Sequence, residues 1–169
     1  ARDVTKTNSY RLETFRSNEL GCLGYADSDE QAVFYRTTTK PHTQDAEFDV
    51  DSVHTLPRVD IAYAYAGADG LLVRALVDAG VAGIVAGGLG SGGSPSKMMA
   101  ALKAAAQSGV PVVIATQTGN GRVVRTRRYD EDGYIVADNL SPKKTRILLM
   151  MALTKTKDPE EIQRMMLTY

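Results

Sequence analysis

The sequence predicts an α/β fold: a small parallel sheet with flanking helices, preceded by a β-rich segment. From Val59 onward, apolar runs alternate with segments of helical period. The runs at 83–86 and 110–115 are apolar throughout, which is typical of parallel strands covered on both faces. Residues 1 to about 40 differ from this pattern, because they are polar and contain only short alternating runs.

The β-rich segment contains three short candidate strands. They centre on Phe15, on Gly24 and Tyr25, and on residues 32–35. The polar stretch 27–30 is typical of a turn, so it predicts a hairpin between the second and third of these strands.

Residues 41–57 have no hydrophobic period and carry a proline at each end, which predicts a linker. A strand is then expected at 59–65, and a helix at 71–79 that ends at Gly80. Helices are also expected after each of three pairs in which an N-cap residue precedes a proline: Ser94-Pro95, Ser141-Pro142 and Asp158-Pro159.

The glycine-rich run 87–94 lies between a predicted strand and a predicted helix, and it matches G-x-G-x-x-G. A dinucleotide site of this type also needs an acidic residue about 20 positions further on. The chain has no Asp or Glu between Asp78 and Asp130. We therefore interpret the run as a tight β–α turn, with the wall of a small-molecule site at the sheet edge as a further alternative.

Composition excludes several function classes. The formal net charge is zero, from 20 basic and 20 acidic residues, which gives no reason to expect nucleic acid or an anionic membrane as partner. No apolar run approaches the ~18 residues of a membrane span. The lone Cys22 cannot form an internal disulfide and is expected to be a small packed side chain.

Other polar clusters have plain interpretations. His42 and His54 have no metal-ligand spacing, so we expect surface or interface histidines. An arginine cluster precedes the acidic run 130–132, which predicts a solvated and partly self-neutralised loop; its members are Arg122, Arg125, Arg127 and Arg128. The six methionines stand at helical positions and are expected to pack in a core or an interface.

Residues 2–8 read R-D-V-T-K-T-N, which resembles a signature of bacterial type II L-asparaginases and glutaminase-asparaginases. The resemblance continues in order along the chain, through Thr14-Phe15, His42-Thr43, Leu56-Pro57-Arg58-Val59, Gly83-Ile84-Val85, Ala152–Pro159 and Tyr169. The resemblance implies hydrolysis of the side-chain amide of asparagine, and often of glutamine, to the acid and ammonia, without cofactor or metal.

The resemblance assigns Lys6 the role of catalytic base or proton relay beside a threonine. The family's two catalytic threonines and their aspartate lie upstream of residue 1, so we expect this chain to be an inactive C-terminal portion. Residues 1–40 would end a larger α/β N-terminal domain, 41–57 would be the linker, and 58–169 the C-terminal α/β domain.

The resemblance also implies a homo-oligomer, most simply a homotetramer, because the family closes each active site with a neighbouring subunit. Two positions depart from its pattern there. Gly67 stands where the family often has Asn or Gln, and Arg128 stands where it has Glu. A periplasmic or secreted location is implied in the same way, with a cytoplasmic one still open.

Two other functions remain open from the sequence. An asparaginase-like subunit of a tRNA-dependent amidotransferase would need a basic surface, against which the neutral charge balance argues. A non-catalytic α/β binding or interaction module is the second alternative, because the chain lacks a threonine nucleophile with its partners.

Overall fold

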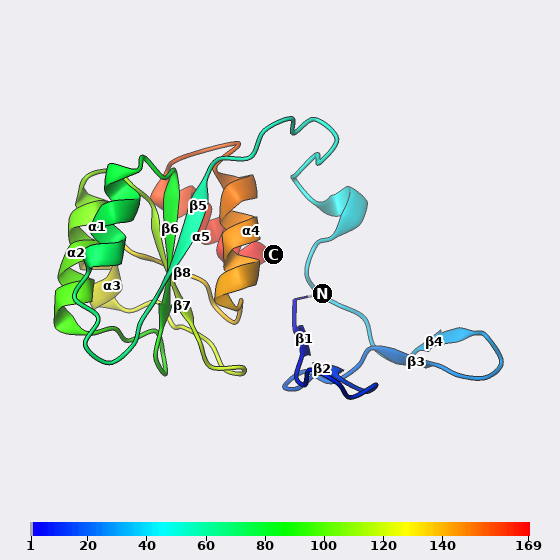
Figure 1. The fold of residues 1–169 in the computed structure, drawn as a ribbon. Helices are drawn as coiled ribbons and strands as arrows, with labels where there is room; N and C mark the ends of the chain where they lie inside the picture. The colour runs from blue at the N-terminus through cyan, green and yellow to red at the C-terminus, as the bar shows by residue number, and fades with distance from the viewer. Residues whose placement is uncertain (1) are drawn as a thin grey trace. The chain divides into compact units, whose positions relative to one another are not determined.

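The computed structural model describes residues 2–169, which form two compact units divided after Ala46. The first unit contains two antiparallel hairpins (Figure 1). Its elements are β1 (Val4–Lys6) paired with β2 (Phe15–Ser17), β3 (Gly24–Ala26) paired with β4 (Ala32–Phe34), and the 3-10 turn η1 (Thr43–Asp45). The predicted turn at 27–30 is confirmed, because it joins β3 to β4.

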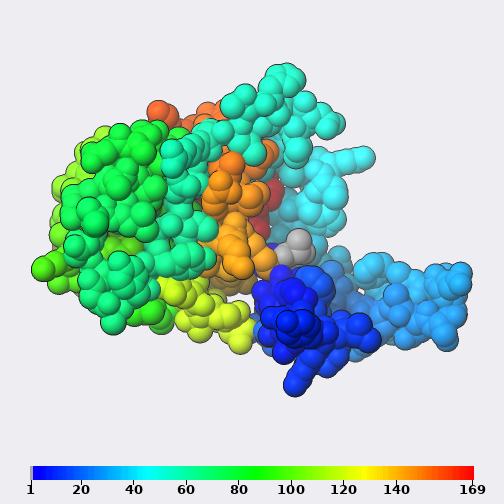
Figure 2. Space-filling view, viewed as in Figure 1, coloured from blue at the N-terminus to red at the C-terminus, as the bar shows by residue number. Residues whose placement is uncertain are grey.

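The first unit has little apolar core of its own. Within residues 2–46 only Thr14 is buried, whereas Phe15, Phe34 and Tyr35 are about 70% exposed (69%, 71% and 74%). The β3–β4 hairpin extends as an arm with all of β4 exposed (Figures 1 and 2). The expected packing of Cys22 is wrong: the thiol is exposed, because no apolar side chain of residues 2–46 is buried to form a core around it.

The second unit, from Glu47 onward, contains a parallel four-stranded sheet in the order β5-β6-β7-β8. Its strands are β5 (Val59–Tyr63), β6 (Gly83–Gly88), β7 (Val112–Thr116) and β8 (Ile135–Val136). The two central strands are buried along their whole length, as their uninterrupted apolar runs predict. The sequence reading missed β8, because two residues are too few to show a period.

Three helices connect the strands, and two more follow the sheet. Figure 1 shows α1 (Leu71–Asp78) and α2 (Ser96–Gln107) on one face, and α4 (Pro142–Ala152) and α5 (Pro159–Thr168) on the other. The strands are in sequential order, and crossovers of one hand then place all the connecting helices on the same face of the sheet. The short α3 (Arg127–Glu131) agrees with this, because its Tyr129 packs in the same core as α1 and α2. The sheet is therefore covered on both faces, as predicted.

Alternation along the strands builds two cores. Ile84 and Ala86 of β6 pack toward α1 and α2, whereas Val85 packs toward α4 and α5. The methionines take part on both sides: Met98 is buried in the first core, and Met165 and Met166 are buried in the second.

The predicted helix starts are confirmed for α4 and α5, each of which begins at a proline. The Asp158 carboxylate accepts a hydrogen bond from Glu160 N, as an N-cap should. The start of α2 was predicted wrongly. Pro95 is itself the cap residue, with an extended backbone, and its carbonyl accepts the first helical bond from Met99 N at 2.9 Å.

The glycine-rich run is a tight turn after β6, which confirms that interpretation. Leu89 and Gly93 exchange two backbone hydrogen bonds of 2.7 and 2.8 Å across it. A Cβ on Gly88 would lie 2.2 Å from the carbonyl carbon of Gly92, so only glycine fits there. Gly92 also has φ +101°, which L side chains rarely adopt.

The C-terminal helix holds the beginning of the second unit. Arg164 pairs with Glu47 at 2.7 Å, and Glu47 N donates a hydrogen bond of 2.8 Å to the Tyr169 hydroxyl. The rings of Phe48 and Tyr169 lie 5.1 Å apart. Residues 47 and 48 are thus part of the folded unit, although the chain reaches β5 only eleven residues later. Of the helices in residues 2–169, none is long and apolar enough to cross a membrane.

Candidate active site

Lys6 ends β1, directly opposite Phe15 of β2. Its ammonium nitrogen lies 5.2 Å from the centre of the Phe15 ring, within the range of a cation–π contact. The lysine side chain is otherwise exposed on the hairpin. The strand pairing therefore fixes the position of its backbone and leaves the amine accessible to a reacting group.

The residues that follow Lys6 are held by one buried threonine. Thr14 is 4% exposed, and its carbonyl accepts hydrogen bonds from Thr7 N (2.8 Å) and Thr7 Oγ1 (3.0 Å). Its hydroxyl accepts from Asn8 N at 2.8 Å and donates to the Asn8 carbonyl. The T-K-T-N segment is thus a locally braced loop, and Thr14 is the residue that fixes it.

An open cavity of about 340 Å³ lies beside this loop, within the first unit. It is lined by Thr7, Asn8, Arg11, Glu13, Thr14, Arg16 and Asn18. Arg16 pairs with Glu13 at 3.6 Å, so part of the charge is neutralised within the loop. Sequence reasoning did not find this hollow, because it arises from how the loop folds back on β2.

Gly67 lies in the loop between β5 and α1. Its φ is +83°, and a Cβ built there would meet nothing within 4 Å. The loop is ordered around it by a turn bond from Ala68 N to the Tyr65 carbonyl (3.1 Å) and by the Asp69 carboxylate, which accepts from Leu71 N (3.0 Å). This bond lowers the pKa of Asp69. Gly67 therefore supplies an open, turned backbone with no side chain.

Arg128 lies on α3, not in a loop, so that part of the prediction is wrong. Thr126 caps this helix by accepting a hydrogen bond from Tyr129 N. The helix has five residues, which are too few to show a hydrophobic period in the sequence. Arg128 is exposed. Burial raises the pKa of the neighbouring Tyr134 to about 12, and the positive charge of Arg128 opposes this rise. The predicted self-neutralisation is confirmed nearby, because Arg125 pairs with Asp130 at 2.5 Å.

The structure does not bring Gly67 and Arg128 together. Gly67 follows β5 and Arg128 precedes β8, and these are the two edge strands of the sheet. With a strand spacing of about 4.8 Å, the edges of a four-stranded sheet are about 14 Å apart. Lys6 belongs to the other unit.

Gln117 braces the carboxyl edge of the sheet, a role that the sequence reading missed. Its side-chain amide donates to the carbonyls of Ala64 (2.7 Å) and Gly87 (2.6 Å), and its backbone N donates to that of Gly88 (2.9 Å). The preceding Thr116 hydroxyl donates to the Gly90 carbonyl at 2.5 Å. A polar residue directly after a buried strand was the available signal. Within residues 2–169, no three His, Cys, Asp or Glu side chains converge as a metal site.

Comparison with known proteins agrees with this geometry. Residues 58–166 match the Glutaminase/Asparaginase C-terminal domain, which includes all four strands of the sheet and nearly all of α5. The chain belongs to the glutaminase/asparaginase family.

Relatives within the glutaminase/asparaginase family match almost the whole chain. L-asparaginase 2 of Escherichia coli (strain K12) is 40% identical over 99% of this chain and 49% of its own length. The glutaminase-asparaginase of Pseudomonas fluorescens biotype A is 38% identical over 99% and 47%. A Haemophilus influenzae protein named "Probable L-asparaginase periplasmic" is 37% identical over 97% and 47%. The chain spans about half the length of these relatives.

Family membership confirms the resemblance predicted from R-D-V-T-K-T-N and from the dispersed segments after it. It also confirms the predicted fold class, since the parallel sheet with flanking helices lies within the matched region. The roles of Lys6, Gly67 and Arg128 stay predictions, because the matches compare whole segments and not the chemistry of single side chains.

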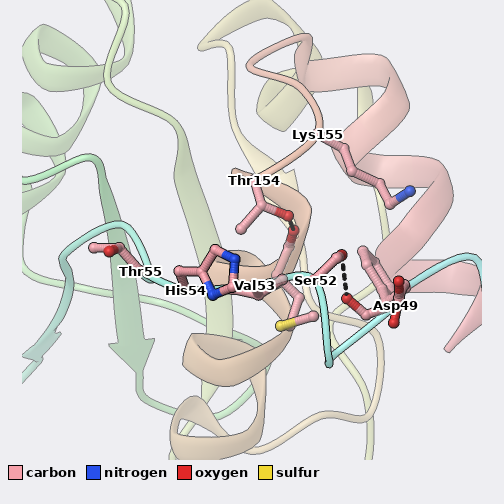
Figure 3. A pocket seen from close by; sticks show the side chains of 9 residues that line it. Asp49, Ser52, Val53, His54, Thr55, Thr154 and Lys155 are labelled. Atoms are coloured by element: carbon pink, nitrogen blue, oxygen red, sulfur yellow. Dashed lines mark hydrogen bonds between the residues drawn. The ribbon is translucent and has the colours of Figure 1, made fainter.

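A second cavity, of about 320 Å³, lies in the 47–169 unit (Figure 3). His54 contributes to its lining, so this histidine lies at a hollow in the surface. His42, in contrast, is exposed and contacts the hydroxyl of its neighbour Thr43 at 3.3 Å.

Proposed function

We propose that the protein is an amidohydrolase that hydrolyses L-asparagine to L-aspartate and ammonia, with L-glutamine as a candidate second substrate. The observation that supports this most directly is the Lys6 hairpin: a lysine presented on a braced β-strand, in a chain whose relatives are named asparaginases and glutaminase-asparaginases. The family membership of the 58–166 region supports it independently.

In the proposed reaction, Lys6 accepts a proton from a threonine hydroxyl as that oxygen attacks the side-chain amide carbon. The carbon–nitrogen bond then breaks, and the proton leaves with the nitrogen as ammonia. Water hydrolyses the resulting threonyl ester, which releases the acid and regenerates the hydroxyl. The threonine would come from residues outside this chain, so Lys6 is the one member of the catalytic set that we assign here.

The proposal includes the division of labour along the chain. Residues 1–40 would complete a larger catalytic domain, 41–57 would link the domains, and 58–169 would form the C-terminal domain. That domain would close the site of a neighbouring subunit in a homotetramer, with the open backbone at Gly67 and the exposed Arg128 as candidate substrate contacts. The name of the Haemophilus influenzae relative supports a periplasmic location.

A chimera tests this proposal. The part of Escherichia coli L-asparaginase 2 that precedes its matching region is joined to this chain, and ammonia release from L-asparagine and L-glutamine is measured. We expect a tetramer that releases ammonia, whereas this chain alone releases none above background. A tetrameric chimera with native-like circular dichroism but no ammonia release would contradict the proposal. Turnover by this chain alone would contradict the assignment of the nucleophile to residues outside it.

A further inference from the structure

The cavity in Figure 3 lies between residues 48–55 and the end of α4 with the turn that follows it. Its volume of about 320 Å³ is at the small end of the range for small-molecule sites. Its lining residues are Phe48, Asp49, Ser52, Val53, His54, Thr55, Met151, Thr154 and Lys155, all within the 47–169 unit. None of them has a part in the proposed amide hydrolysis.

Two exposed side chains at the cavity can donate hydrogen bonds and have no acceptor among residues 2–169. The Lys155 ammonium and the His54 ring come from different segments, and neither has a hydrogen bond or ion pair among residues 2–169 (Figure 3). The Ser52 and Thr154 hydroxyls, in contrast, donate to backbone carbonyls at 2.8 and 2.7 Å. The available donors therefore suit a carboxylate group.

One acid also lines the cavity. Asp49 Oδ1 accepts a hydrogen bond from Asp51 N at 3.2 Å, and the carboxylate has no cationic partner among the described residues. A ligand with only a carboxylate would place its negative charge near that of Asp49, and nothing would compensate the Asp49 charge. A ligand that also carries an ammonium group would satisfy Asp49 as well as Lys155.

Three of the side chains that line the cavity are apolar. Phe48 is held against Tyr169 with ring centres 5.1 Å apart, and Phe48, Val53 and Met151 are half-buried. Methionine adapts to ligands of varied shape, and a fixed aromatic ring gives a firm contact surface. These three side chains can contact a short hydrocarbon group.

We propose that this cavity binds an α-amino acid with a short apolar side chain. The carboxylate pairs with Lys155, the ammonium pairs with Asp49, and the side chain lies against Phe48, Val53 and Met151. This ligand differs from the amide substrates of the proposed reaction, so the site is separate from that chemistry.

The test is isothermal titration of the whole chain with L-leucine. We expect one saturable site with a Kd below about 10 mM. Leucinamide, which lacks the carboxylate, and 4-methylpentanoate, which lacks the ammonium, should each bind at least about fivefold more weakly. Absence of saturable binding, or equal binding of all three compounds, would overturn the proposal.

Matched variants locate the site. Lys155→Gln and Asp49→Asn should each weaken L-leucine binding at least about fivefold. Asn at 49 keeps the Oδ1 acceptor that Asp51 N uses, so the loop should be preserved. The neighbouring exposed residues serve as controls, and Lys157→Gln and Asp51→Asn should leave binding unchanged. Equal losses in test and control variants would reduce the effect to general electrostatics. Because the readout is binding, the result does not depend on ammonia release.

Discussion

Gln117 Nε2 lies 2.7 Å from the carbonyl oxygen of Ala64, and the same nitrogen lies 2.6 Å from that of Gly87. One side chain thus joins the segment that follows β5 to the end of β6 at the carboxyl edge of the sheet. The segment after β5 continues into the loop that contains Gly67, so the position of that loop depends on Gln117.

We expect Gln117→Leu to lower the free energy of unfolding by about 1–3 kcal/mol, because the Ala64 carbonyl loses its donor and the Gly87 carbonyl keeps only its bond from Ala64 N. Urea denaturation measures the change. Gln107→Leu is the control, since Gln107 is exposed at the end of α2. Amide hydrogen exchange at residues 65–70 should accelerate in the Gln117 variant alone. Equal stability of both variants would show that the brace contributes nothing.

The C-terminal tyrosine gives a second prediction. Tyr169→Phe removes the hydroxyl that accepts a hydrogen bond from Glu47 N at 2.8 Å, while it keeps the ring against Phe48. We expect a loss of about 1 kcal/mol in unfolding free energy, and faster exchange of the Glu47 amide. Tyr63→Phe is the control, because Tyr63 is exposed and its hydroxyl has no hydrogen bond among residues 2–169. Unchanged exchange at Glu47 would contradict a stabilising role for the hydrogen bond between Glu47 N and the Tyr169 hydroxyl.

The glycine turn gives a third prediction. Gly88→Ala places a Cβ 2.2 Å from the backbone of Gly92, which cannot move without breaking the turn. We expect a loss of at least about 3 kcal/mol, or failure to fold. Gly119→Ala, where a Cβ meets nothing within 4 Å, should change stability little. Thermal unfolding of both variants measures the difference. A wild-type melting temperature for Gly88→Ala would refute the close contact between Gly88 and the backbone of Gly92.

The ion pair between α5 and the segment before α3 predicts a pH effect. Hydrogen bonds from Arg125 lower the pKa of the Glu160 carboxyl. A lowered folded-state pKa contributes stability that is present above the ordinary value and is lost as pH falls through the folded one. Carbon-13 titration should therefore show Glu160 titrating below the ordinary value of about 4.5, and near that value in Arg125→Gln. Identical titration curves in the two proteins would rule out the pairing in solution.

Much of the fold could be predicted from residue pattern. The apolar run 83–86 and the proline at 142 predicted β6 and α4, because burial on both faces and helix capping leave local signals. β8 and α3 left none, since two and five residues are too few to show a period. Cys22 was placed wrongly because its burial depends on an apolar core, and no apolar side chain in residues 2–46 is buried.

The candidate site divides in the same way. Lys6 could be found from its motif, because the signature is local in sequence. The brace formed by Gln117 joins residues 53 and 30 positions away, and the cavity at Lys155 joins segments about 100 residues apart. Such contacts arise only from tertiary packing, so no pattern within one segment could reveal them.

Lys6 provides the most direct test of the proposed function. In the active chimera, Lys6→Met removes the amine but keeps a long side chain over Phe15, so β1 should remain paired with β2. We expect kcat for L-asparagine to fall by about 10²–10⁴-fold with little change in circular dichroism. Lys157→Met, at an exposed lysine between α4 and α5, should retain full kcat. Wild-type kcat in a folded Lys6→Met protein would contradict the account and leave Lys6 as a surface charge.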